Sequence, residues 1–344
     1  MKRSFIGALL IALLLSGCSL TQDKNVTTEG SDNVSQVVEM ENTKPDAFDA
    51  DIKNNSLVIS PDEKIAIVSN SGIGKIKVYN LETKSEIGEL DEFVTPRHIA
   101  FSENGKYFYI SDSSYGLIRE FEIETLKEVR SFDVGKGVFG FTLTNRGDMI
   151  FANNQDQSTV TVINLGTGKI EKVIEGFSQP RQGIVVDSND EFVYVTNFEG
   201  NDVRVINTET LEIEKTLSGI PSIRAISVDT ENNLLYGASS SENTINVVDI
   251  NTGEVLKSIP VGQEPYGAAL SPDKTVILSG EKGSNQVSVI DTATLEVVRT
   301  VEGLNEPRQA IVYSSENGKA YVLNADLSIS VIDYANGQVI DTIK

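Results

Sequence analysis

The stretch EFVYVTNFEGNDVRVIN, residues 191–207, has the pattern of two β-strands joined by a turn. Aromatic and β-branched residues dominate both halves, which suits a pleated ribbon. Residues 197–202 between them supply Asn, Gly and Asp, which tolerate tight turns. Because a hairpin of this length cannot bury its own faces, it needs further strands beside it.

The same pattern recurs along the chain at intervals of 42 or 43 residues. The position of Tyr194 is large and apolar or aromatic in every copy, where its equivalents are Ile67, Tyr109, Phe151, Tyr236, Leu278 and Tyr321. A period near 42 residues with strand-type content is typical of a β-propeller, with one blade per repeat. The sequence therefore predicts an all-β fold over residues 52–344, a seven-bladed β-propeller with four antiparallel strands per blade.

Residues 1–17 have the pattern of a signal peptide. Lys2 and Arg3 precede an apolar run over residues 5–15, which is too short to span a bilayer comfortably. The following LSGC, residues 15–18, resembles the lipobox of bacterial lipoproteins, in which the Cys becomes the acylated N-terminus. The alternative is an ordinary signal peptide with a chance Cys. The resemblance implies that Cys18 carries a lipid and anchors the chain to the extracytoplasmic face of the cell membrane.

Residues 18–51 are rich in Thr, Asn, Ser, Asp and Glu and contain few apolar residues. Such a composition cannot repay the entropy lost on folding, so we predict a flexible acidic tether between the lipid and the propeller.

The chain is strongly acidic, with a formal net charge of −21. Removal of residues 1–17 takes away Lys2 and Arg3 and no acid, which makes the charge −23. This balance argues against a nucleic-acid partner and favours a soluble monomer. One Cys and one His exclude an internal disulfide and a multi-His metal site, so we expect no metal and no cofactor.

The tetrapeptide YVTN at residues 194–197 is the signature of the YVTN β-propeller repeat family. YISD at residues 109–112 and YVLN at residues 321–324 are similar to it. The chain resembles this family over about residues 53–344. The resemblance implies the fold, but no catalytic residue, because the motif residues fill the blades or form turns. Members of the family are largely known as surface or secreted proteins of unassigned activity.

Four arginines lie near the predicted starts of the inner strands: Arg97, Arg181, Arg224 and Arg308. In a propeller these starts surround one mouth of the central channel, the usual ligand site of this architecture. Guanidinium groups suit carboxylate or phosphate, so we predict an anion-binding mouth. The residues expected beside the arginines are His98, Phe139, Gln182, Tyr266 and Gln309. The alternative is that each arginine binds an acidic neighbour or loop carbonyls and ties the blades together.

His98 is the only histidine of the chain. Its equivalents are small in the other repeats, namely Ser56, Gly140, Gly183, Ala225, Gly267 and Ala310. We therefore expect the imidazole to point into the channel or its mouth, as a general base, as a pH-sensitive contact or as a side chain that fills space.

Two functions are consistent with these patterns. The first is a membrane-anchored module that binds an anionic ligand or an extracytoplasmic protein through its channel face. The second is a hydrolase that acts in the channel on a small anionic sugar acid or lactone, an activity known for some seven-bladed propellers. Arginines locked to acidic neighbours would favour the module, and an unpaired carboxylate beside Arg and His would favour the enzyme. Redox chemistry with a quinone cofactor has no supporting Trp or further His. We expect the binding module, without a catalytic residue.

Overall fold

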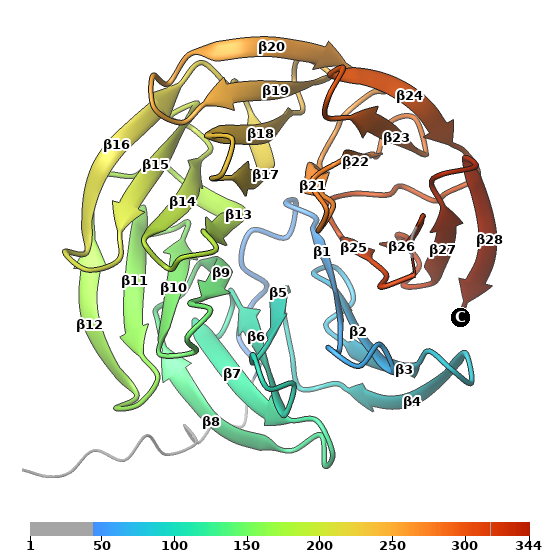
Figure 1. Cartoon of the computed structure of the whole chain (residues 1–344). Coiled ribbons are helices and arrows are strands. Elements are labelled where there is room, and N and C mark those ends of the chain that lie inside the picture. Colours follow the sequence, from blue (N-terminus) through green and yellow to red (C-terminus); the bar gives the residue numbers. More distant parts are fainter. Residues whose placement is uncertain (1–43, 317) are drawn as a thin grey trace, which may run out of the picture. The chain divides into compact units, whose positions relative to one another are not determined.

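The computed structural model of the protein describes residues 44–316 and 318–344. The predicted signal peptide, Cys18 and most of the predicted tether lie outside the described residues. The described part forms seven four-stranded antiparallel sheets around a central channel (Figure 1). This confirms the predicted seven-bladed β-propeller.

Each blade is made of four strands that follow one another in the chain. Blade 1 contains β1 (Asn55–Ile59), β2 (Ile65–Asn70), β3 (Ile76–Asn80) and β4 (Ser85–Leu90). Blade 2 contains β5 (Pro96–Phe101), β6 (Tyr107–Asp112), β7 (Leu117–Glu122) and β8 (Glu128–Asp133). Blade 3 contains β9 (Val138–Leu143), β10 (Met149–Asn154), β11 (Thr159–Asn164) and β12 (Lys169–Ile174). Blade 4 contains β13 (Pro180–Val186), β14 (Phe192–Asn197), β15 (Asp202–Asn207) and β16 (Glu212–Ser218).

The remaining blades repeat this order. Blade 5 contains β17 (Ile223–Asp229), β18 (Leu234–Ser239), β19 (Thr244–Asp249) and β20 (Val255–Pro260). Blade 6 contains β21 (Ala269–Leu270), β22 (Val276–Glu281), β23 (Gln286–Asp291) and β24 (Glu296–Val301). Blade 7 contains β25 (Ile311–Tyr313), β26 (Lys319–Leu323), β27 (Ile329–Asp333) and β28 (Gln338–Ile343).

The hydrophobic core lies between neighbouring blades. The second and third strands of a blade, such as β14 and β15, are buried along most of their length, because the adjacent sheets cover both of their faces. Tyr194 of blade 4, for example, packs in one cluster with Ile226 and Leu235 of blade 5. The outermost strands are far more exposed, as β24 shows. Each repeat therefore encodes a sheet that is stable only when it packs against the adjacent sheets.

The YVTN motif has a structural role in blade 4. The Tyr194 side chain is buried, and the Thr196 hydroxyl donates to the Gly183 carbonyl at 3.0 Å. Asn197 accepts a hydrogen bond from the Ser178 amide and donates to an Asp202 carboxylate oxygen at 3.0 Å. Asp112 occupies the same position in blade 2, where it accepts the amide of Val94 at 2.7 Å. In blades 4 and 2 the last position of the motif therefore binds the segment that leads into the inner strand.

Among the described residues the ring closes through side chains, without a strand exchanged between its ends. One core cluster combines residues of the first and last blades, among them Leu57, Tyr79, Leu323 and Ile343. The Tyr79 hydroxyl also donates to the Leu327 carbonyl at 3.3 Å. These contacts join β1–β3 to blade 7 across the whole length of the chain.

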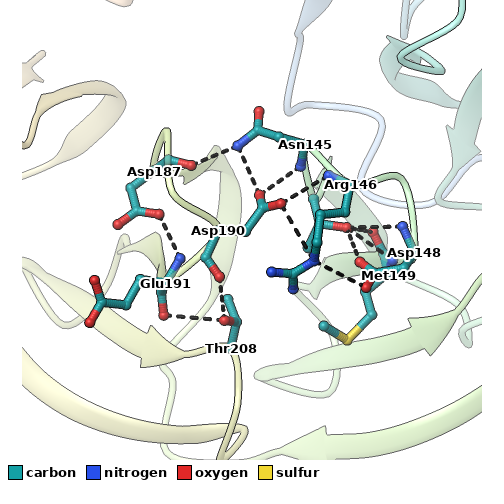
Figure 2. A network of polar contacts seen from close by, with 9 residues as sticks. Asn145, Arg146, Asp148, Met149, Asp187, Asp190, Glu191 and Thr208 are labelled. Atoms are coloured by element: carbon teal, nitrogen blue, oxygen red, sulfur yellow. Dashed lines mark hydrogen bonds and ion pairs between the residues drawn. The ribbon is translucent and has the colours of Figure 1, made fainter.

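A polar tie between blades 3 and 4 lies in the turns that connect first and second strands (Figure 2). The buried Asp190 carboxylate accepts the backbone amides of Asn145 at 2.6 Å and Arg146 at 2.9 Å. The Thr208 hydroxyl donates to the Asp190 carbonyl at 2.5 Å. Side chains of this turn thus bond directly to the backbone of the adjacent blade.

Candidate functional site

The predicted arginines and aromatic residues meet at one mouth of the channel, where the inner strands start. The Cζ of Arg181 lies 3.8 Å, and that of Arg224 4.4 Å, from the centroid of the Phe198 ring. Arg224 and Arg308 lie in the same way over Tyr266, at 4.8 and 5.2 Å. Phe198 and Tyr266 therefore each contact two guanidinium groups, which cation–π attraction favours.

Arg97 belongs to the mouth but is occupied by the backbone. Its side chain is fully buried, and its Cζ lies 4.6 Å from the ring centroid of the buried Phe139. Its guanidinium donates to Ser113 Oγ at 3.0 Å and to the carbonyls of Phe48, Asp49 and Ile52. Burial lowers the pKa of Arg97 to about 10, so the group remains charged at neutral pH. Arg97 thus takes the alternative role, in which the arginine binds loop carbonyls.

Two of the three carbonyls that Arg97 binds, those of Phe48 and Asp49, lie within residues 18–51, for which we predicted a flexible tether. The Phe48 amide donates to Ser114 Oγ at 2.8 Å, and the Gln155 amide donates to an Asp49 carboxylate oxygen at 2.5 Å. Lys136 Nζ lies 5.7 Å from the centroid of the Phe48 ring. In Figure 1 this part of the chain, at the blue end of the colour bar, runs toward β1 across the centre of the ring. Residues 44–51 are therefore part of the channel mouth.

Arg308 is also held by the chain that leads into β1. It donates to the Lys53 carbonyl at 2.7 Å and forms an ion pair with Glu306 at 3.5 Å. Gln309 donates to the Asn55 carbonyl at 2.6 Å. These bonds join blade 7 to the start of blade 1, so Arg308 and Gln309 stabilise the closed ring.

Arg181 and Arg224 are the two half-buried arginines of the mouth that have no ion pair with a described residue. Arg181 donates to Gln179 Oε1 at 2.9 Å, and Arg224 donates to Ser240 Oγ at 3.0 Å. The buried Nε of Arg181 has no partner among the described residues. Burial lowers the pKa of both groups, and the next guanidinium along the ring lowers it further.

The channel below the mouth encloses a cavity of about 250 Å³. His98 lies in its wall, together with the buried Gln182 and with Gln309. The Phe141 amide donates to His98 Nδ1 at 3.3 Å, and burial lowers the pKa of His98 to about 4. The imidazole is therefore neutral at pH 7, and no carboxylate of a described residue bonds to it.

Sequence reasoning missed the contribution of Phe48 and Asp49 to the mouth. Both lie in a polar segment without strand periodicity, and the carbonyls that Arg97 binds leave no trace in a residue pattern. One signal was present, because Phe48 is the only aromatic residue between Cys18 and Asn54. Phe198 lies in the predicted turn at residues 197–202, but its position between two arginines depends on the arrangement of the blades.

The described residues contain no group of three or more His, Cys, Asp or Glu side chains placed to hold a metal ion. Within the same residues, no helix is long and apolar enough to span a bilayer.

Comparison with known proteins extends these observations. The family model of the seven-bladed β-propeller lactonases matches residues 24–139, and that of the cytochrome D1 heme domain matches residues 187–344. The chain is a seven-bladed β-propeller, and one part of it is similar to the lactonase propellers and another to the cytochrome D1 heme domain. No curated protein matches it. Among solved structures, this propeller is similar to the hydrazine synthase of Kuenenia stuttgartiensis, with a TM-score of 0.72 and 14% identity over 88% of this chain and 99% of that chain. At this identity the similarity concerns the fold alone.

The similarity to a heme domain does not bring a set of heme ligands with it. Heme iron is held in proteins by His, Cys, Met or Tyr. Residues 187–344 contain no His, Cys or Met, and Tyr266 at the channel mouth is stacked between two arginines. Residues 187–344 therefore offer no His, Cys or Met to ligate a heme iron.

Proposed function

We propose that the chain is a lipid-anchored, extracytoplasmic binding module that holds an anionic ligand at the channel mouth, against Arg181 and Arg224. The observation that carries this proposal is that both guanidinium groups are half-buried and lack an ion pair with any described residue, although the chain has a net charge of −21. Arg181 and Arg224 are thus not locked to acidic neighbours, which differs from what we expected of a module. The enzyme is not favoured either, because no carboxylate of a described residue bonds to His98.

The energetics of the mouth support an anion as the ligand. Burying a cation away from water costs free energy unless an opposite charge or hydrogen bonds compensate it. Arg224 lowers the pKa of Arg181, which means that the two charges repel each other. A carboxylate or phosphate would remove this repulsion and accept hydrogen bonds from both groups, an arrangement for which the guanidinium geometry is well suited.

Hydrolysis of a lactone or sugar acid in the channel is the alternative, which the similarity to the lactonase family suggests. It is less well supported by the contacts of the channel. A general base needs a partner that orients it and a pKa near the working pH. His98 accepts a backbone amide through Nδ1 and has its pKa lowered to about 4.

The first test is the affinity of the protein for phosphate, citrate and a panel of sugar acids, measured by calorimetry. We expect the double variant Arg181→Gln/Arg224→Gln to bind its best ligand at least 10-fold more weakly than wild type, because charge-assisted hydrogen bonds contribute about 1.5–3 kcal/mol each. Arg299→Gln is the matched control, since Arg299 is exposed on β24, away from the channel.

Equal affinities of wild type and both variants would contradict the proposed site. The same protein is incubated with lactones, and acid release is followed. Turnover that Arg181→Gln/Arg224→Gln or His98→Gln abolishes would establish the alternative, a hydrolase.

A further inference from the structure

The channel mouth already holds a peptide, namely residues 48–52 of the chain itself, which we call the resident segment. Arg97 donates to three of its carbonyls, at 3.0 Å for Phe48 and 3.4 Å for Asp49, with Ile52 as the third. Ser114 Oγ accepts the Phe48 amide at 2.8 Å. The mouth thus contacts both the donors and the acceptors of a main chain, which is how proteins hold peptides of varied sequence.

Two side chains of the resident segment also meet complementary groups. The Asp49 carboxylate accepts the Gln155 amide, and its charge acts favourably on Arg97 and Arg181. The Phe48 ring lies beside Lys136 Nζ. The Asp49 carboxylate is therefore bound by Gln155, and the Phe48 ring is contacted by a different side chain, Lys136.

The buried charge of Arg97 requires an occupant. Without the resident segment, its two terminal nitrogens would lose the three carbonyls that satisfy them in the structure. A charged donor left without an acceptor in a buried position is strongly destabilising. An inorganic anion would supply charge but not the row of carbonyls, whereas another peptide would supply both.

We propose that the channel mouth recognises an acidic peptide, and that residues 48–52 are its resident occupant, displaced when a partner's peptide binds. The inference deepens the proposed function, on which it rests, by naming the class of anionic ligand. Since the resident segment is covalently attached, its effective concentration is in the millimolar range, so a free peptide of equal affinity competes poorly with it.

The experiment weakens the resident segment and adds the same peptide from outside. The probe is fluorescein-labelled PDAFDADI, the sequence of residues 45–52, titrated into the full chain while anisotropy is measured. We expect the variant Phe48→Ala/Asp49→Asn to bind the probe at least 10-fold more tightly than wild type. The matched control is Asp46→Asn/Asp51→Asn, because both residues are exposed in the same region and make no hydrogen bond or ion pair with described residues. It should behave as wild type.

A probe with both substitutions, PDAANADI, should bind the Phe48→Ala/Asp49→Asn protein at least 10-fold more weakly than PDAFDADI. Equal affinities of all protein variants, or no binding by the weakened variant up to millimolar probe, would overturn the inference. Hydrogen exchange on wild-type protein gives a second measurement that needs no variant. Excess unlabelled PDAFDADI should speed exchange of the Phe48 amide, and an unchanged rate would also count against displacement.

The two proposals fail separately. Anion binding that depends on Arg181 and Arg224, without any peptide binding, would remove the inference and keep the proposed anion site. Peptide binding that is insensitive to Arg181→Gln/Arg224→Gln would keep the peptide site and remove the anion site.

Discussion

Arg97 and Arg181 show how residues at equivalent positions of a repeat acquire different roles. Arg97 is completely buried and satisfied by Ser113 and the resident segment, whereas Arg181 is half-buried with one hydrogen bond. Their contacts separate an arginine that holds the fold together from one whose guanidinium group we propose binds an anion.

Replacement of Arg97 should therefore destabilise the fold. We expect Arg97→Ala to lower the free energy of unfolding by about 3 kcal/mol, since it removes several charge-assisted hydrogen bonds and leaves three partly buried carbonyls without this donor. The thermal midpoint should fall by roughly 5 °C or more. Arg299→Ala, at an exposed position on β24, should leave it unchanged. Equal midpoints for the two variants would mean that the bonds of Arg97 contribute nothing.

For individual residues, the sequence predicts where a side chain lies in its blade better than which groups that side chain contacts. The spacing placed Arg97, Arg181, Arg224 and Arg308 at one mouth, and His98 in the channel wall, because the period of the repeat fixes where each residue falls in its blade. It could not predict that Arg97 binds carbonyls 45 to 49 residues earlier in the chain. Backbone carbonyls are the same in every sequence, so such a bond carries no pattern.

The turns between the first and second strands contain equivalent ties between blades. Glu63 of blade 1 has a φ of 52° and Asp190 of blade 4 a φ of 56°, and both carboxylates accept a backbone amide from the preceding blade. Glu63 receives the Ser315 amide and, at 2.8 Å, the Ser314 hydroxyl. It therefore links blade 7 to blade 1 in the way that Asp190 links blades 3 and 4 (Figure 2).

This tie should make ring closure sensitive to acid. Burial raises the pKa of Glu63, but the hydrogen bonds from Ser315 and Ser314 outweigh it, so the pKa lies below its ordinary value of 4.5. The hydrogen bonds to ionised Glu63 stabilise the folded protein fully at a pH above the pKa that Glu63 has in the unfolded chain. This stabilisation is lost as the pH falls through the lower pKa that Glu63 has in the folded protein. We expect Glu63→Gln to cost about 1 kcal/mol at pH 7, and this cost should disappear as the pH falls through the pKa of Glu63 in the folded state.

Thermal unfolding of wild type and Glu63→Gln between pH 3 and 7 measures this difference. Glu82→Gln is the control, because Glu82 is exposed and forms no hydrogen bond or ion pair with described residues. A cost that stays constant over this pH range would show that the charge of Glu63 is not responsible.

Whole strands were predicted most accurately where the repeat is regular. Tyr194 and its six equivalents, for example, all lie in the second strand of their blade. The inner strands of blades 6 and 7 are shorter than the pattern indicates, with two residues in β21 and three in β25. The backbones come close together there, since a Cβ on Gly280 would lie 2.0 Å from the Arg308 carbonyl oxygen. Such packing between blades does not appear in the sequence of either one.

For the whole molecule, the proposed anchor gives a prediction that is independent of the channel. Cys18→Ala should move the protein from the membrane fraction to the soluble fraction and abolish labelling by an alkyne analogue of palmitate, because a doubly acylated Cys provides stable anchoring. Immunoblots of fractionated cells check this outcome, with Ser19→Ala as the control for altered processing. Membrane association that survives Cys18→Ala would show that another element binds the chain to the membrane.

The closure of the ring through side chains also determines how the molecule can fold. Every sheet pairs strands that are neighbours in the chain, so each blade completes its hydrogen bonds from a short stretch of sequence, and such local contacts favour fast folding. The junction of blades 7 and 1 is the exception, because Glu63 and Ser314 are 251 residues apart. Blades can therefore form one after another during synthesis, as an open arc, and the bonds between the two ends come last.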